Sequence, residues 1–200
     1  TLTNTAAATT SWSIAANDAP TVNSISATGI ESLVGSSTNN DTFVFGDGVT
    51  LSGTLNGNGG TNHLDVSAYT TKVTVNLLAG TATGITGAVS NIDEYTANAS
   101  VTTNEMIANS TWTITGDDTG TVDSVTFNNF PYLTGNAAHA DTFTFNGAYQ
   151  ISGKIDGVGG SNKVVGYAAN TAWNVTDDDT FTQTITGATG ATSCENIGSI

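Results

Sequence analysis

Apolar and polar residues alternate in short runs along the whole chain, and glycine and asparagine separate these runs. In TTSWSIAA (9–16), Trp12 and Ile14 fall on one side of an extended backbone, and Ser11 and Ser13 fall on the other. A period of two is typical of a half-buried β-strand. The alternation returns in TFVF, TLSGTLNG, NHLDVS and KVTVNL, and later in STWTIT, TFTF, QISGKIDG, NKVVGY and AWNVTD. The pattern predicts an all-β chain with strands of about five residues.

The chain contains one unit twice, at an offset of 100 residues. Residues 39–48 read NNDTFVFGDG and residues 139–148 read HADTFTFNGA, and 25 of the 78 positions from 11 to 88 are identical at this offset. An internal repeat of this kind is typical of stacked architectures. We therefore expect a first repeat, 1–100, and a second repeat, 101–200, in one continuous solenoid cut from a longer chain.

The turn residues favour a solenoid over the other all-β folds. Antiparallel hairpins favour two-residue Asn-Gly or Asp-Gly turns, whereas LNGNGGTNHL and IDGVGGSNKV form longer corners in which glycine can adopt a positive φ. Stacked coils bury their inward faces against one another, so a chain of modest hydrophobic content can fold in this way. The sequence predicts a right-handed parallel β-solenoid (β-helix), with tandem β-sandwich domains as the alternative.

Composition and charge exclude several classes of protein. The strong helix formers Glu, Lys, Arg, Met and Gln are scarce, which argues against a helical domain. The net charge is −14 and the only cationic residues are three lysines, at 72, 154 and 163. Because phosphate recognition relies on Arg and Lys, we expect no nucleic-acid partner. No apolar run is long enough for membrane insertion, and the single cysteine, Cys194, is expected to be a small buried side chain.

The corners resemble those of repetitive bacterial exoproteins. ESLVGSSTNNDTFVFGDG is similar to the GGxGxDTFxFxxG coils of repeats-in-toxin proteins, and LNGNGGTNHLDVSAY is similar to the companion segments of very large bacterial surface proteins and adhesins. TGIESLVG is similar to the seams between coils of such proteins. The resemblance implies the β-solenoid repeats of a secreted bacterial surface exoprotein or large adhesin, with degenerate repeats-in-toxin-like turns.

Asp41 and Asp141 are the candidate calcium ligands. In repeats-in-toxin coils, glycine carbonyls and an aspartate of tandem nonapeptides surround each ion, because Ca²⁺ needs several oxygen ligands. The turns GSSTNND and GNAAHAD keep one carboxylate each but lose the flanking glycines. An aspartate that binds the backbone of its own turn is the alternative interpretation. Beyond Ca²⁺, no cofactor is expected.

The strand after each aspartate is expected to supply the core. It places Phe43 and Phe45, or Phe143 and Phe145, on one face, where each ring buries a large apolar area. The three tryptophans are also expected in the core rather than on the surface as platforms for sugars: Trp12, Trp112 and Trp173.

No catalytic set stands out in the sequence. Glycoside hydrolysis needs two carboxylates that face each other, and the candidates on a solenoid wall are Asp41, Asp47, Asp65 and Asp156. The chain lacks arginine, and its acidic surface would repel an anionic sugar polymer. The acidic clusters 117–118 and 177–179 are interpreted as solvated loops, and the histidines at 63 and 139 as surface residues.

The expected function is a non-catalytic structural or adhesive repeat that forms a stiff rod at the cell surface, as an adhesin stalk, an extracellular filament or a surface layer. Its partners would be neighbouring repeats or copies of itself, with surface glycans or proteins as further partners. The alternatives are a carbohydrate-active β-helix enzyme and an ice-binding solenoid, for which residues 180, 182, 184 and 186 supply a threonine face.

Four segments fit the Asn-X-Ser/Thr acceptor pattern for asparagine-linked sugars. They begin at Asn40, Asn98, Asn109 and Asn174. Because asparagine and threonine are common in this chain, matches by chance are expected. The sequence therefore leaves glycosylation open.

Overall fold

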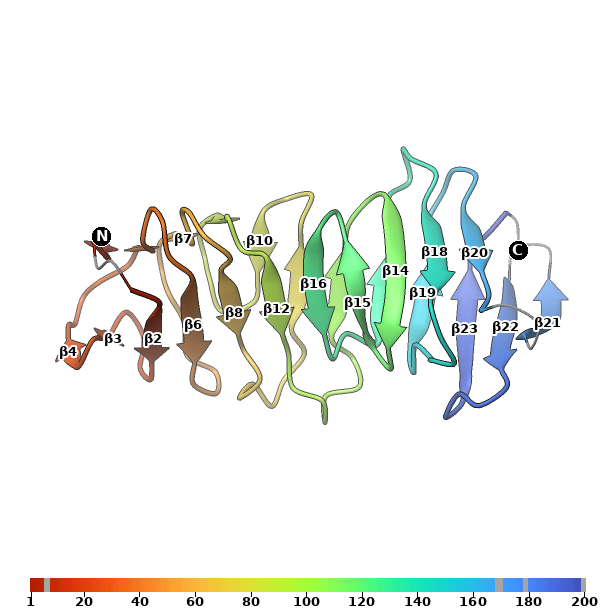
Figure 1. Cartoon of the computed structure of the whole chain (residues 1–200), viewed down its shortest axis with the longest axis horizontal. Coiled ribbons are helices and arrows are strands. Elements are labelled where there is room, and N and C mark those ends of the chain that lie inside the picture. The colour runs from red at the N-terminus through yellow and green to blue at the C-terminus, as the bar shows by residue number, and fades with distance from the viewer. Residues whose placement is uncertain (6–7, 168–170, 178–179, 199–200) are drawn as a thin grey trace. The chain divides into compact units, whose positions relative to one another are not determined.

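The computed structural model describes residues 1–5, 8–167, 171–177 and 180–198. These residues form strands and no helix (Figure 1), which confirms the all-β prediction. In the described part of the chain, therefore, no helix has the length and hydropathy needed to cross a membrane. The chain divides into two compact units, unit 1 (Thr1–Val101) and unit 2 (Thr102–Ile200).

Unit 1 contains two rows of parallel strands, and the chain alternates between them. The first row has the order β1 (Leu2–Thr3), β5 (Leu33–Val34), β7 (Leu55–Asn56) and β11 (Val89–Ser90). The second row has the order β2 (Thr10–Ile14), β6 (Asp41–Phe45), β8 (His63–Asp65) and β12 (Glu94–Thr96), which lie side by side in Figure 1. We call the stretch of chain from one first-row strand to the next a coil.

Antiparallel hairpins interrupt this parallel pattern, which the sequence analysis did not predict. β3 (Pro20–Val22) and β4 (Ile25–Ser26) extend the second row beyond β2, and β9 (Thr74–Asn76) pairs with β10 (Thr81–Ala82). The turn between β3 and β4 consists of Asn23 and Ser24, whose φ angles are 50° and 63°. Two positive φ angles define a type I′ turn. The turn escaped sequence analysis because it lacks the usual glycine.

Unit 2 follows the same plan. Its first row is β13 (Glu105–Ile107), β17 (Tyr132–Thr134), β19 (Lys154–Asp156) and β23 (Ala191–Glu195), all parallel. Its second row is β14 (Thr111–Gly116), β18 (Thr142–Phe145) and β20 (Lys163–Val165). Antiparallel strands β15 (Thr119–Val122) and β16 (Val125–Asn128) extend β14, while β22 (Thr180–Ile185) and β21 (Thr171–Asp177) extend β23.

In-register pairing stacks similar side chains in the interior of unit 1. Trp12 of β2 is opposite Phe43 of β6, and the next strands add Leu64 and Tyr95 at the same level. All four side chains are buried. The ring centroids of Trp12 and Phe43 lie 5.5 Å apart at an interplanar angle of 24°. Such stacked aromatic pairs contribute about 1 kcal/mol beyond the area they bury.

Unit 2 forms the corresponding stack. The rings of Trp112 and Phe143 lie 5.3 Å apart at 20°, and Phe127 meets Trp112 edge to face at 5.9 Å. The predicted core positions are confirmed as buried at Trp12, Trp112, Phe43, Phe45, Phe143 and Phe145. The side chain of Trp173 lies outside the described part of the chain, as does that of Asp177, with residues 178 and 179.

Candidate functional site

Asp41 lies at the corner where β6 begins, and its side chain is buried, with 1% exposure. Its Oδ2 accepts a hydrogen bond from the backbone N of Ser36 at 2.6 Å, and its Oδ1 accepts from Trp12 Nε1 at 3.0 Å and from Asn4 Nδ2 at 3.1 Å. Gly35 leaves space for this carboxylate, because a Cβ at Gly35 would lie 2.7 Å from Asp41 Oδ2. One carboxylate therefore ties its own turn to two other segments of unit 1.

The backbone at this corner is held by the next coil. The N of Asp41 donates to Oδ1 of Asn62 at 3.0 Å, and the N of Asn62 donates to Oδ2 of Asp93 at 2.7 Å. Asn62 is 1% exposed, and its Nδ2 donates to the carbonyl oxygen of Asn91 at 3.0 Å. The side chain of one coil thus satisfies backbone groups of its neighbour. We call Asn4, Asp41, Asn62 and Asp93 the corner column of unit 1.

Unit 2 has a corresponding corner column with fewer donors to its aspartate. Asp141 is fully buried; its Oδ1 accepts from the N of Ser110 at 2.7 Å and its Oδ2 from the N of Asn136 at 2.9 Å. Its own N donates to Asn162 Oδ1 at 2.8 Å. The indole N–H of Trp112, although buried, has no hydrogen-bond partner among the described residues. The corner column of unit 2 comprises Asp141 and Asn162.

The two predicted aspartates therefore act as corner residues in the structure. The sequence analysis did not assign a role to Asn62 or Asn162, although the identity of these two residues at the repeat offset was an available signal. Among the described residues, no group of three or more His, Cys, Asp or Glu side chains is arranged to hold a metal ion. Calcium binding at Asp41 and Asp141 stays a prediction.

A second pair of aspartates lies at the tips of two hairpins, β2–β3 in unit 1 and β14–β15 in unit 2. Each of these aspartates binds a serine elsewhere in its own unit. Asp18 has a φ of 51°, and its carboxylate accepts hydrogen bonds from the N and Oγ of Ser52 at 2.8 and 2.9 Å. Asp118 has a φ of 52° and binds Ser152 in the same way, at 2.7 and 2.6 Å. Asp118 of the acidic loop 117–118 therefore also binds a neighbouring segment of unit 2.

The carboxylates proposed for an enzyme are each bound locally. Asp47 accepts from the N of Thr70 at 2.8 Å, and Asp65 accepts from the N of Ser67 at 2.9 Å. Asp156 pairs with Lys154, whose Nζ lies 3.2 Å from its Oδ2. Lys154 Nζ also contacts Glu195 Oε1, so the carboxylates of Asp156 and Glu195 converge on one ammonium group and form an ion-pair cluster with it. These contacts fix surface turns and strand ends.

The remaining titratable candidates have structural surroundings. His63 is half-buried on β8 and its Nε2 lies 2.9 Å from Thr96 Oγ1, whereas His139 is exposed. Cys194 is fully buried on β23, and burial raises the pKa of its thiol to about 12. The thiol is therefore protonated at neutral pH, and its burial confirms the predicted small core side chain.

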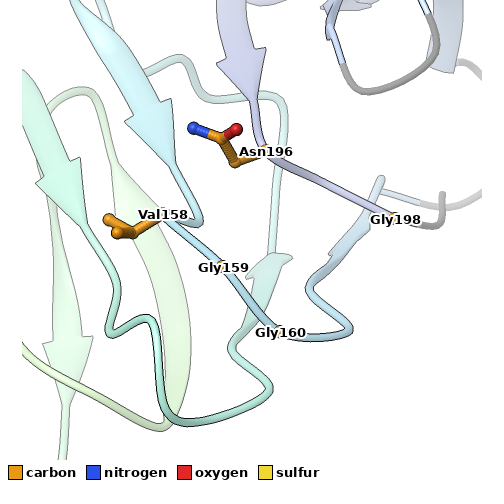
Figure 2. A pocket seen from close by; sticks show the side chains of 5 residues that line it. All are labelled: Val158, Gly159, Gly160, Asn196 and Gly198. Atoms are coloured by element: carbon orange, nitrogen blue, oxygen red, sulfur yellow. The ribbon is translucent and has the colours of Figure 1, made fainter.

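Two of the pockets on the described surface have no charged residue in their lining. The first, of about 160 Å³, lies where the turn after β19 meets the segment after β23, with Val158 and Asn196 at its rim (Figure 2). The second, of about 300 Å³, lies in unit 1 beside β1 and β4 and includes Leu2, Val22 and Ile25. Because no lining residue is charged, neither pocket offers a side chain for acid–base chemistry.

Comparison of the chain with protein-family models, with curated proteins and with solved structures finds no match. Function is therefore inferred from the residues of the chain itself. Its most distinctive built feature is the repeated polar corner beside a stacked aromatic core.

Proposed function

We propose that the chain is a non-catalytic structural repeat of a secreted bacterial surface protein, and that it forms a stiff rod in an adhesin stalk, an extracellular filament or a surface layer. The corner column is the observation that carries this proposal. In it, the buried side chains of one coil bind the backbone of the next, as Asn62 binds Asp41 and Asn162 binds Asp141. These residues serve the contact between coils.

We further infer that the coils close into a right-handed parallel β-solenoid. Two features support this inference: the chain alternates between two parallel rows, and a further parallel bridge joins Leu51 to Ile85 on the coils of β7 and β11. In a solenoid each coil contacts only its neighbours, so length grows by about 4.8 Å per coil and stiffness comes from the contacts between coils.

The surface chemistry is consistent with a scaffold. The acidic candidates for catalysis are engaged in turns and ion pairs, and the net charge of −14 favours solubility over contact with anionic polymers. Neighbouring repeats or further copies of the chain are the proposed partners, with surface glycans or proteins as additional ones. The bacterial source and the secreted location rest on the resemblance of the corners to those of bacterial exoproteins.

Small-angle X-ray scattering combined with thermal unfolding tests the proposal, in calcium and in chelator. We expect an elongated particle with the same melting temperature in both buffers, because N–H donors already occupy the carboxylates of Asp41 and Asp141. A compact particle would contradict the solenoid. A large loss of stability in chelator would instead assign these aspartates to calcium.

A further inference from the structure

The four Asn-X-Ser/Thr segments lie in different structural settings. In the segment at Asn40, the middle residue is the buried Asp41, and Thr42 lies in β6, between Ser11 of β2 and His63 of β8. A hydroxyl residue fixed between two strands cannot turn back towards its asparagine. This segment is therefore built into the sheet.

The segments at Asn109 and Asn174 are also extended. Ser110 donates its backbone N–H to Asp141, and Thr111 begins β14, where it is opposite Thr142 of β18. The segment at Asn174 lies inside β21. In all three segments, the residue two places after the asparagine belongs to a strand.

The segment at Asn98 is a turn. It follows β12, and the N of Val101 donates to the carbonyl oxygen of Asn98 at 3.1 Å. The N of Ser100 donates to the side-chain Oδ1 of Asn98 at 2.8 Å, which is the geometry of an Asx-turn. Ala99 and Ser100 are both exposed. Asn98 itself is half-buried, and its side-chain amide lies on the same tight turn as the exposed Ser100.

We propose that Asn98 is the acceptor of an asparagine-linked glycan. The proposal rests on the secreted location in the proposed function, because such sugars are attached outside the cytoplasm, on surface loops. The hydrogen bond from Ser100 N to Oδ1 draws electron density from the side-chain amide, which makes a proton on Nδ2 easier to remove. The turn thus presents the reacting amide in a favourable form.

The sugar donor is a polyprenyl-diphosphate-linked oligosaccharide. Nδ2 of Asn98 forms a bond to C1 of the first sugar while the bond from C1 to the diphosphate oxygen breaks. The polyprenyl diphosphate leaves with the electron pair of that bond, and one Nδ2 proton passes to a base of the transferring enzyme. No oxidant or reductant is needed.

Unit 2 supplies an internal control. At the same offset it reads Gly198, Ser199 and Ile200, so the position equivalent to Asn98 has no acceptor asparagine. The proposal therefore gives one glycan on this chain, at the end of unit 1.

The test incubates the folded, purified chain with a single-subunit oligosaccharyltransferase that accepts Asn-X-Ser/Thr, together with its lipid-linked oligosaccharide. Intact mass and peptide mass spectrometry then locate the product. We expect one glycan, on Asn98, and at least a tenfold loss of product in Asn98→Gln and Ser100→Ala. Ser100→Thr and Asn40→Gln should keep full modification, and circular dichroism verifies the fold of each variant.

Two outcomes would overturn the proposal. One is a glycan at Asn40, Asn109 or Asn174 in place of Asn98. The other is an unmodified chain in a mixture that modifies a short acceptor peptide. The reaction uses purified components, so it reports on Asn98 independently of where the chain resides. A compact particle in the scattering experiment would therefore contradict the proposed rod without affecting this result.

Discussion

The regions around Trp12 in unit 1 and Trp112 in unit 2 have similar apolar contacts but different hydrogen bonds. Trp12 and Trp112 stack on Phe43 and Phe143 at nearly the same distances, 5.5 and 5.3 Å. Trp12 donates its indole N–H to Asp41, whereas the N–H of Trp112 has no partner in the described part of the chain. The repeat has kept the packing and varied the hydrogen bonds.

Thr10 and Ser110, which lie two residues before Trp12 and Trp112, show how the difference arises. In unit 1, the hydroxyl of Thr10 donates to the carbonyl oxygen of Ala8 and accepts from Asn4, which leaves Asp41 Oδ1 to Asn4 and the indole. In unit 2, the backbone N of Ser110 donates to Oδ1 of Asp141 instead. Ser110 has a φ of 147°, which L-residues rarely adopt. A local backbone change therefore decides whether a buried indole is satisfied.

The largest expected effect is the loss of the corner carboxylates. Asp41→Ala removes the acceptor of three N–H donors and Asp141→Ala removes that of two, and the loss of each such bond costs about 1 kcal/mol or more. We expect the free energy of unfolding to fall by about 3 kcal/mol in Asp41→Ala and by about 2 kcal/mol in Asp141→Ala. Urea titration followed by circular dichroism measures both. An equal or larger loss in Asp141→Ala would show that the polar difference between the corners has no energetic weight.

Substitution of the tryptophans isolates the indole hydrogen bond. Trp12→Phe and Trp112→Phe remove similar ring area from fully buried sites, but only Trp12 loses a bond to a carboxylate. Since such bonds contribute about 2 kcal/mol, Trp12→Phe should destabilise by about that much more than Trp112→Phe. The comparison uses the same urea titration. If Trp112→Phe proves the more damaging variant, the unpaired indole in unit 2 has a partner in solution.

Two equivalent residues in the glycine-rich corners can be exchanged for one another. Val158 and Asn58 occupy equivalent positions with φ of 64° and 67°, a conformation that suits asparagine and strains a β-branched residue. Val158 is 43% exposed, so little burial is lost on substitution. We expect Val158→Asn to stabilise and Asn58→Val to destabilise, each by about 1 kcal/mol, as shifts of melting temperature in opposite directions. A shift of the same sign in both variants would contradict the argument from strain.

The smallest expected effect concerns acid stability. Asn56 and Asp156 occupy equivalent positions, and the Oδ1 of each accepts from the backbone N two residues later at 2.8 Å. Burial raises the pKa of Asp156, but hydrogen bonds, first from Asn196 and also from Lys154, lower it overall. Its folded pKa thus lies below the unfolded value of about 4. The stabilisation is present above that value and is lost as pH falls through the folded pKa.

The variant Asp156→Asn places in unit 2 the residue that unit 1 has at the equivalent position, Asn56, and removes the titrating carboxylate. Melting temperatures between pH 2 and 7 should therefore fall less steeply on the acid side in Asp156→Asn than in the parent chain. Identical slopes would show that the lowered pKa of Asp156 contributes nothing measurable to acid stability.

The sequence predicted the strands, the repeat and the aromatic core because each follows from local patterns: alternation, self-similarity and large apolar side chains. It also singled out Asp41 and Asp141. It did not predict the hairpins at Asn23 and Asp123, because these turns lack glycine. Nor did it give Asn62 a role, since the partners of Asn62 lie 21 and 29 residues away.

The chain's sequence thus determined the class of structure, because a period of two and a scarcity of helix formers act residue by residue. Only the tertiary structure decided which polar side chains are buried and what they bind. Asp41 and Asp47 look alike in the sequence, yet one is enclosed by donors from two distant segments and the other binds a surface turn. The physical reason is that a buried polar group needs partners in space, and the pairing of strands far apart in the sequence brings those partners together.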